Sequence, residues 1–302
     1  MRGFVGFRNK TNVQLDQGAT LQALPSNAEN YGVVVFQDVI GSSIFGGGSI
    51  LGERGTHQGT TGEWGMGIKI QGNCQNIQVM NLILGLCWGD GIYINGGSQI
   101  LVSGVNSHDN RRQGLSIVNG EMIKILNSSF QNTNGTLPMF GIDIEPNEGS
   151  LISNVTVQGC LLQGNAGCGI SAGVPQALIG KAQTINVLIT GCKAYGNGAK
   201  STDGVQSGMQ IAGMVNAVLS LNFCQYNAGD GIQVYGGAKN TIINSCQIDS
   251  NKENGIEFYQ AGGEVQNCTI TNNAQYGIRH DYAGFPVSNV NNAISGNKFD
   301  KF

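Results

Sequence analysis

Two acidic residues, Asp143 and Glu145, stand two positions apart within a run of alternating apolar residues. If this run is a β-strand, both side chains project from one face, roughly 6–7 Å apart. Paired carboxyl groups can break a glycosidic bond, because one protonates the leaving oxygen while the other activates water or attacks the sugar. We assign Glu145 as the acid and Asp143 as the base or nucleophile, and the reverse order stays open.

An exposed Asp–Glu pair is more often a solvated surface than a catalytic site, so the hypothesis depends on what surrounds it. Asp90 is expected nearby and is our third catalytic candidate, while Arg111 and Arg112 stand in a turn between the two acidic segments. An arginine beside one carboxyl group lowers its pKa, which keeps that group ionised and separates the roles of the acids. The arginines could equally form structural ion pairs with Asp143 or Asp109.

Aromatic residues, histidines and further acids are expected to converge on the same few strands, as a binding surface for several sugar rings would require. Each has a structural alternative, because histidines in loops are commonly hydrogen-bonded turn residues and tryptophans commonly pack. We predict no resident metal or cofactor, with Ca²⁺ needed only if the chemistry is that of a lyase. The predicted substrate-binding residues are His57, Glu63, Trp64, Trp88, Tyr93, His108, Arg111, Arg112 and Glu148.

A repeat positions these residues. The phrase glycine, aliphatic residue, any residue, then usually an apolar residue recurs nine times, with successive glycines 22 to 39 residues apart. Each repeat holds three short apolar segments bounded by Gly or Asn, without helical periodicity, which predicts a parallel β-helix of about 22–24 residues per coil. We expect one domain over 1–302, with less regular coils at 1–66 and regular ones at 67–302. Because no capping helix is evident, we expect a fragment of a longer chain or ends covered by oligomerisation.

Stacked coils turn equivalent repeat positions into columns. We expect five cysteines to share one buried column (Cys160, Cys192, Cys224, Cys246 and Cys268), and asparagines to bond from coil to coil after the third strand (Asn110, Asn165, Asn197, Asn251, Asn273 and Asn297). Longer connections at 132–140, 173–184 and 198–207 should lie on the binding face. The predicted outward column of the repeat is Lys69, Tyr93, Ser116, Asp143, Ser171, Gln210, Gln233, Glu257 and Arg279.

The composition excludes several classes of partner. The chain has 302 residues, of which 48 are glycine and 12% are charged, with a net charge of −3. This balance gives no electrostatic basis for binding nucleic acid or an anionic membrane. No apolar run approaches transmembrane length, and the first residues do not resemble a signal peptide.

Three segments carry a family resemblance: WGDGIYI at 88–94, NRRQGLSI at 110–117 and NTNGTLPMFGIDIEPN at 132–147. They resemble the right-handed parallel β-helix proteins of the pectate-lyase-like superfamily, and are most similar to the polysaccharide-degrading tailspikes of bacteriophages. The resemblance covers about residues 10–300 and implies a polysaccharide depolymerase, a homotrimer with carbohydrate along the helix face or between subunits, and an extracellular or virion-surface location.

Other activities in this superfamily remain alternatives. Mannuronan epimerases carry Tyr-Gly-Phe-Asp-Pro-His-Glu on such a strand, and here Phe140 and Glu145 replace the tyrosine and histidine, which argues against epimerisation. β-Elimination of a uronic acid is the second hypothesis, with Arg111, Arg112 and His108 available to neutralise the substrate carboxylate or act as base. A non-catalytic carbohydrate-binding or structural adhesin is the third.

Overall fold

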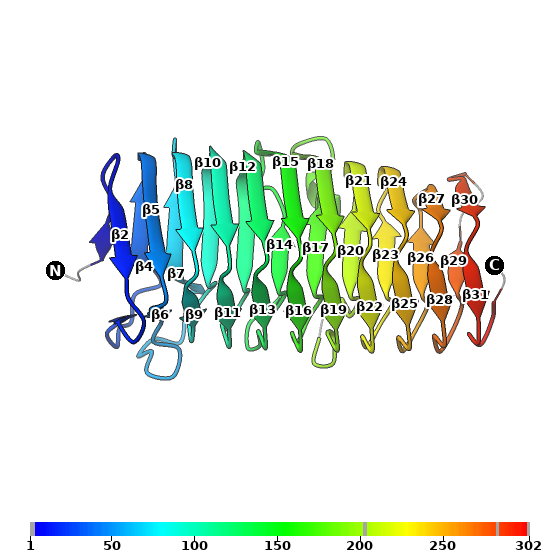
Figure 1. Cartoon of the computed structure of the whole chain (residues 1–302), viewed down its shortest axis with the longest axis horizontal. Coiled ribbons are helices and arrows are strands. Elements are labelled where there is room, and N and C mark those ends of the chain that lie inside the picture. The colour runs from blue at the N-terminus through cyan, green and yellow to red at the C-terminus, as the bar shows by residue number, and fades with distance from the viewer. Residues whose placement is uncertain (1–3, 202–203, 282–283, 301–302) are drawn as a thin grey trace.

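The computed structural model describes residues 4–201, 204–281 and 284–300, and these form one elongated parallel β-helix (Figure 1). Strands stack along its length in a 20-stranded sheet and an 11-stranded sheet. The one helical segment in the described ranges is the three-residue 3₁₀ turn η1 (Gln176–Leu178), and none of their helices is long and apolar enough to cross a bilayer.

Each coil contributes three strand segments, as the repeat predicts. The first ladder contains β1 (Val5–Gly6), β4 (Asn30–Gln37), β7 (Trp64–Gln71), β10 (Ile92–Ser103), β12 (Leu115–Leu126), β14 (Ile142–Ile144), β17 (Ile170–Gly173), β20 (Met209–Ala212), β23 (Ile232–Tyr235), β26 (Ile256–Tyr259) and β29 (Ile278–His280). The second contains β2 (Asn12–Leu15), β5 (Ile40–Gly46), β8 (Gln75–Met80), the far halves of β10 and β12, β15 (Leu151–Gln158), β18 (Gln183–Thr190), β21 (Val215–Ser220), β24 (Lys239–Asn244), β27 (Gly263–Gln266) and β30 (Val287–Val290).

The 11-stranded sheet is the third ladder. Because β10 and β12 each run through the first and second ladders, those two ladders join into the single 20-stranded sheet. The members of the third ladder are β3 (Thr20–Gln22), β6 (Ser49–Leu51), β9 (Ile83–Gly85), β11 (Asn106–His108), β13 (Ser129–Gln131), β16 (Leu161–Gln163), β19 (Lys193–Tyr195), β22 (Phe223–Gln225), β25 (Gln247–Asp249), β28 (Thr269–Thr271) and β31 (Ala293–Ser295).

The outward column of the first ladder is confirmed in full by the strand register, from Lys69 paired with Tyr93 through to Glu257 paired with Arg279. The register shifts only where β10 meets β12, so that Asn95 pairs with Asn119. The aliphatic residues on either side of this column point inward and are buried, forming one continuous apolar core.

The repeated glycine is required by close approach between coils. A Cβ built on Gly114 would lie 2.5 Å from the carbonyl oxygen of Gly141, and one on Gly141 would lie 2.5 Å from that of Gly169. Real Cβ atoms do not approach a carbonyl oxygen so closely, so any other residue would push the coils apart. The glycine column therefore holds the start of each first-ladder strand against the next coil.

A buried asparagine ladder links the coils at the bend after the third strand. Side-chain amides donate to the next carbonyl oxygen at 2.8–3.0 Å along Asn165, Asn197, Asn227, Asn251, Asn273 and Asn297. Asn227 is a member that the sequence analysis missed, whereas the predicted member Asn110 bonds to Ser107 instead. The left-handed backbone conformations belong to other asparagines, including Asn132 and Asn272.

All eight cysteines are free thiols and buried, as predicted. Cys160 and Cys246 donate their backbone N–H groups to the sulfur atoms of Cys192 and Cys268, each at 3.4 Å. The placement of Cys224 in this column was wrong, because Cys224 pairs with Ala194 and Ile248 inside the third ladder. The column cysteines stand five positions before a ladder asparagine, and Asn222 occupies that position in its coil.

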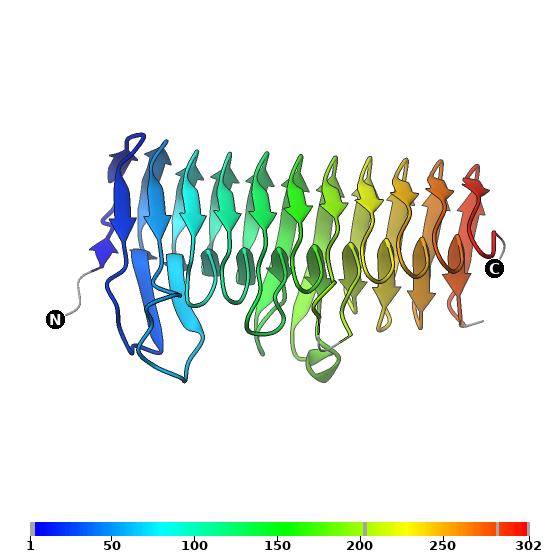
Figure 2. The same cartoon turned by 90° about the horizontal axis from the view of Figure 1, so that it is seen from below.

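The longer connections lie where the repeat is stretched. The segment 132–141 separates β13 from β14, η1 lies between β17 and β18, and 196–208 separates β19 from β20. Figure 2 shows loops of these central coils and of the coils at 22–30 and 52–63 projecting beyond the stacked strands. Of these connections, 132–141 leads directly into β14, the strand that carries Asp143.

Replacing Asn227 by alanine should destabilise the whole helix. Its amide nitrogen bonds to Ala194 and Asn251, while its oxygen accepts from the backbone and side chain of Asn197. Since each buried polar group left unpaired costs about 1–3 kcal/mol, we expect a loss of at least about 3 kcal/mol in urea unfolding. Asn216→Gly, which removes one member of an exposed asparagine row with positive φ, should cost much less.

Candidate active site

Arg112 lies at the centre of an acidic cluster at the N-terminal ends of three first-ladder strands, β7, β10 and β12. Its Nη1 lies 3.2 Å from Oδ2 of Asp90, and its Nε lies 3.8 Å from Oε1 of Glu63. Asp90 is fully buried and also accepts a hydrogen bond of 2.5 Å from Oγ of Ser116. Burial raises the pKa of Asp90 while Arg112 opposes that shift, and the three carboxyl groups of Asp90, Asp143 and Glu63 outweigh burial to raise the pKa of Arg112.

Asp143 is held in β14 one coil further along. It is 5% exposed, Oδ2 accepts from Nε2 of Gln113, and Oδ1 has no partner within the described residues. Burial, together with the nearby charge of Glu145, raises the pKa of Asp143 to about 8, against the lowering effect of Arg112. The carboxyl group is therefore an uncharged acid near neutral pH, poised beside a second carboxyl group.

Glu145 follows β14 and is exposed where Asp143 is buried. Desolvation of its carboxyl group raises its pKa, and Arg112 lowers it. The two carboxyl groups therefore lie in different environments, since Asp143 is buried and Glu145 is exposed. A buried, protonated carboxyl group near an exposed one is an arrangement suited to acid–base chemistry.

A cleft of about 180 Å³ opens beside Glu145. It is smaller than the roughly 300–1,000 Å³ typical of pockets for drug-sized ligands, so it suits one unit of a longer chain. Burial raises the pKa of Tyr235 to about 12, which keeps its hydroxyl protonated as a donor toward the cleft. The walls come from the first ladder and the long connections: Pro138, Phe140, Ser171, Gly173, Val174, Pro175, Val205, Gln210, Ala212 and Tyr235.

The predicted stacking role of Trp88 is not available in this structure. The ring of His57 stacks on it with centroids 3.8 Å apart, and the guanidinium of Arg111 lies 3.7 Å from its ring centroid. Two groups this close cannot share one face, so both faces of Trp88 are covered. Arg111 also donates to the carbonyl oxygens of Gly62 and Trp88, which makes it a structural clamp on the 52–63 connection.

His57 is a buried turn residue, its side chain 0% exposed. Its Nδ1 lies 2.6 Å from Oε1 of Glu53, which also accepts from the hydroxyl of Tyr31 at 2.8 Å. Trp64 is 44% exposed and remains open to solvent, and Tyr93 lies on β10, three residues after Asp90. Of the predicted aromatic and histidine residues, Trp64 and Tyr93 therefore keep the accessibility or position that the prediction requires.

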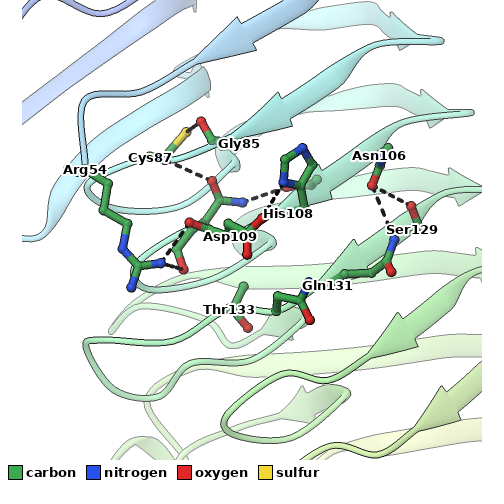
Figure 3. A network of polar contacts seen from close by, with 12 residues as sticks. Arg54, Gly85, Cys87, Asn106, His108, Asp109, Ser129, Gln131 and Thr133 are labelled. Carbon is green, nitrogen blue, oxygen red and sulfur yellow. Dashed lines mark hydrogen bonds and ion pairs between the residues drawn. The ribbon is translucent and has the colours of Figure 1, made fainter.

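His108 and Glu148 are not brought into the cluster by any contact in the structure. His108 lies in β11 of the third ladder, where Nδ1 is 2.7 Å from Oδ2 of Asp109, beside the point where Arg54 reaches the Asp109 backbone (Figure 3). Glu148 is exposed and lies 3.8 Å from Lys181. His108 thus belongs to the third ladder, and Glu148 lies in the turn after β14, three residues beyond Glu145.

Two residues of the site were missed by the sequence analysis as functional candidates. Gln113 holds Asp143, and Tyr235 lines the cleft three coils beyond Asp143. Both positions can be located in the repeat, since Gln113 precedes a repeat glycine and Tyr235 is the last residue of β23. Across the described ranges, no group of three or more His, Cys, Asp or Glu is arranged to hold a metal ion.

Comparison with known proteins agrees with the fold. The family model for the right-handed β-helix region matches residues 27–177 and 177–299. The uncharacterised protein YclG of Bacillus subtilis is 24% identical over 84% of this chain, and the chain spans about half (51%) of that protein. Among solved structures, the A-module of the mannuronan C-5 epimerase AlgE4 from Azotobacter vinelandii has a TM-score of 0.71, at 13% identity over 99% of this chain and 89% of its own.

Two further solved structures share the architecture. Pectate lyase Pel9A aligns with a TM-score of 0.61 at 12% identity, over 98% of this chain and 72% of its own. The catalytic unit of an α-1,3-glucanase from Streptomyces thermodiastaticus aligns with a TM-score of 0.62 at 13% identity, over 96% of this chain and 63% of its own. These TM-scores show a shared β-helix fold and leave the chemistry to the site itself.

The pKa of Asp143 predicts how stability depends on pH. The folded protein retains a proton on Asp143 up to about pH 8, while the unfolded chain releases it near the ordinary value of 3.8. Stability from this group is therefore present at low pH and is lost as pH rises from about 4 to about 8. Asp143→Asn should remove that loss, on the order of a few kcal/mol.

The measurement is urea unfolding of both proteins at pH 5 and pH 8. Asp143→Asn should lose less stability than the wild type across this interval, because Asn keeps the shape and the bond to Gln113 without titrating. Glu148→Gln, at an exposed carboxyl group, should behave as the wild type does. Equal slopes for all three proteins would show that Asp143 is ionised in the folded state.

Proposed function

Because the chain belongs to the right-handed β-helix family, we propose that it is a glycoside hydrolase that cleaves a polysaccharide within the chain, using Asp143 and Glu145. One observation carries this proposal. A buried carboxyl group with an unpartnered oxygen, Asp143, stands beside a second one, Glu145, that lines a cleft on the exposed face of a long helix. The fold is shared with enzymes named for lyase, epimerase and glucanase activities on polysaccharides.

Glu145 is the member of the pair that meets the sugar, because it lines the cleft while Asp143 is 5% exposed. We assign Glu145 as the acid that protonates the leaving oxygen. For these roles the proton that Asp143 holds near neutral pH must first pass to Glu145, after which Asp143 acts as base or nucleophile through Oδ1. This mechanism requires that substrate binding open the cleft side of Asp143, since Oδ1 is shielded in the free protein.

Asp90 has a supporting role in this proposal. Its carboxyl group is bonded to Arg112 and Ser116 and is fully buried, so it cannot contact substrate where it lies. By holding Arg112 in place, Asp90 sets the positive charge that acts on Asp143 and Glu145. Asp90 is thus a positioning residue rather than a third catalytic acid.

The charge balance favours hydrolysis over β-elimination. A lyase must neutralise the carboxylate of a uronic acid, yet Arg112 already bonds to Asp90 and lies near Glu63, and Arg111 covers Trp88. The remaining side chains at the cleft are uncharged apart from Glu145. A surface of this kind suits a neutral sugar better than a polyanion, because an acidic substrate would be repelled by the carboxyl groups.

The setting of the activity is part of the same proposal. We propose an extracellular or virion-surface location, where bacterial surface or capsular polysaccharides are met, and a homotrimer in which grooves between subunits extend the binding face. Light scattering that gives the mass of one chain would contradict the trimer without affecting the hydrolase proposal.

Loss of either carboxyl group should greatly slow cleavage of the polysaccharide. General acid–base catalysis contributes roughly 10²–10⁴-fold to a rate, so Glu145→Gln and Asp143→Asn should each lower kcat by at least about a hundredfold. The assay screens capsular and exopolysaccharides, with α-1,3-glucan, polygalacturonate and polymannuronate included, and measures new reducing ends. Glu264→Gln, on β27 in the second ladder, should retain wild-type activity.

The same assay separates the alternative functions. Hydrolysis yields reducing ends without ultraviolet absorbance, whereas β-elimination adds a conjugated double bond that absorbs in the ultraviolet. A rise in absorbance with each new end would establish a lyase. Cleavage at the wild-type rate by both carboxyl variants would show that the site lies elsewhere, and binding without cleavage of any polymer would favour the adhesin.

A further inference from the structure

A cavity of about 740 Å³ lies at the N-terminal end of the first ladder. Its volume falls within the roughly 300–1,000 Å³ typical of small-molecule sites, and it shares no lining residue with the cleft beside Glu145. Part of its lining comes from the outward face of β4, and another part from the connection at 22–30, which projects beyond the stacked strands (Figure 2). The cavity is therefore separate from the candidate active site.

The walls of this cavity are mostly apolar. Val33 and Val35 stand on the outward face of β4, and Leu24, which is 81% exposed, comes from the connection. The ring of Phe4, 62% exposed, lies across Gly6, which pairs with Val35, because a Cβ built on Gly6 would lie 2.9 Å from Cε2 of Phe4. Large apolar side chains that stay exposed and gather around one hollow are typical of a binding site.

Lys69 is the one charged residue of the lining. It stands on β7 beside Val35, and its Nζ donates a hydrogen bond of 2.8 Å to Oδ1 of Asn30. Burial lowers the pKa of Lys69, and among the residues that the structure describes no carboxyl group pairs with it. Since an ammonium group has three donors, two of them are available to an anionic ligand.

The residues beside Lys69 leave room for such a ligand. A Cβ built on Gly32 would lie 2.9 Å from Cγ2 of Val35 and 3.1 Å from Cβ of Lys69, so any side chain at this position would crowd the stem of the lysine. The hydroxyl of Tyr31 donates to Oε1 of the buried Glu53 at 2.8 Å. The polar group of Tyr31 is thus already bonded, and its contribution to the cavity is the apolar surface of the ring.

We propose that this cavity binds a small aliphatic carboxylate, such as a medium-chain fatty acid, with its apolar chain against Phe4, Leu24 and Val35 and its carboxylate on Lys69. The carboxylate would form charge-assisted hydrogen bonds with an ammonium group that otherwise has no anionic partner. The apolar chain would release water from walls that are now exposed. Because the cavity shares no residue with Asp143 or Glu145, this proposal does not depend on the hydrolase assignment.

The charge and the walls together select this class of ligand. An organic cation would be repelled by Lys69, since no acidic residue lines the cavity. A sugar presents hydroxyl groups all round, and it would leave the apolar walls without a matching surface. A small anion without an apolar chain would leave most of the cavity filled with water.

Isothermal titration calorimetry with hexanoate, octanoate and decanoate tests the site. We expect one carboxylate to bind per chain, and each two added methylene groups to lower the Kd about tenfold, because they are transferred from water to the apolar walls. 1-Octanol, which lacks the charge, and acetate, which lacks the apolar chain, should each bind at least about tenfold more weakly than octanoate.

Two variants address the two halves of the site. Lys69→Met keeps an unbranched side chain but removes the ammonium group, so octanoate should bind at least about tenfold more weakly while the affinity for 1-octanol is not reduced. Leu24→Asn removes apolar surface from an exposed position and should weaken octanoate by about threefold or more. Lys124→Met, at an exposed lysine of β12 in the second ladder, is the matched control and should bind as the wild type does.

Each other outcome overturns the site. No saturable binding of octanoate or decanoate up to about 1 mM would refute it, equal affinity in the wild type and Lys69→Met would exclude the lysine, and an affinity independent of chain length would exclude the apolar walls. A mass of several chains in light scattering that falls to one chain in Leu24→Asn would assign these walls to an interface between copies. Unchanged thermal unfolding of the variants shows that their weaker binding does not come from a loss of folding.

Discussion

The close approach of successive coils at the repeat glycine is the constraint on which the rest of this structure depends. At Gly91, Gly114 and Gly141 the next coil's carbonyl oxygen lies where a Cβ would stand, so the backbone of one coil rests directly on the next. The register that results aligns every first-ladder strand. Inward aliphatic residues then stack into one core, and outward residues stack into columns whose chemistry can be compared from coil to coil.

Because the register is regular, function has to arise from departures from the repeat. Most outward positions carry hydroxyl or amide groups that bond to their neighbours, as Ser171 and Gln210 do. Where an acid enters, as at Asp143, the surrounding strands bury it and its pKa rises. Little water reaches the buried Asp143, so its carboxyl group holds its proton at a pH where a surface aspartate would be charged.

The fold could be predicted almost completely from the chain. Gly-Ile-x-Ile phrases at coil spacing determine strand periodicity, and the outward column from Lys69 to Arg279 followed from counting alone. The errors occurred where a coil departs locally from the spacing of the repeat. Cys224 resembles a column cysteine in the sequence but stands three rather than five positions before its asparagine, and Asn227 went unrecognised as a member of the asparagine ladder.

For the candidate site, the sequence by itself determined the placement of Asp143 and Glu145 on one outer face near Asp90 and Arg112, because strand alternation and register are properties of the backbone. Only the tertiary structure decided the environment of each side chain. It covered both faces of Trp88, buried His57 against Glu53, placed His108 in the third ladder, and brought Tyr235 to the cleft. Loop side chains and pKa values depend on packing between segments far apart in the chain, and no repeat encodes that packing.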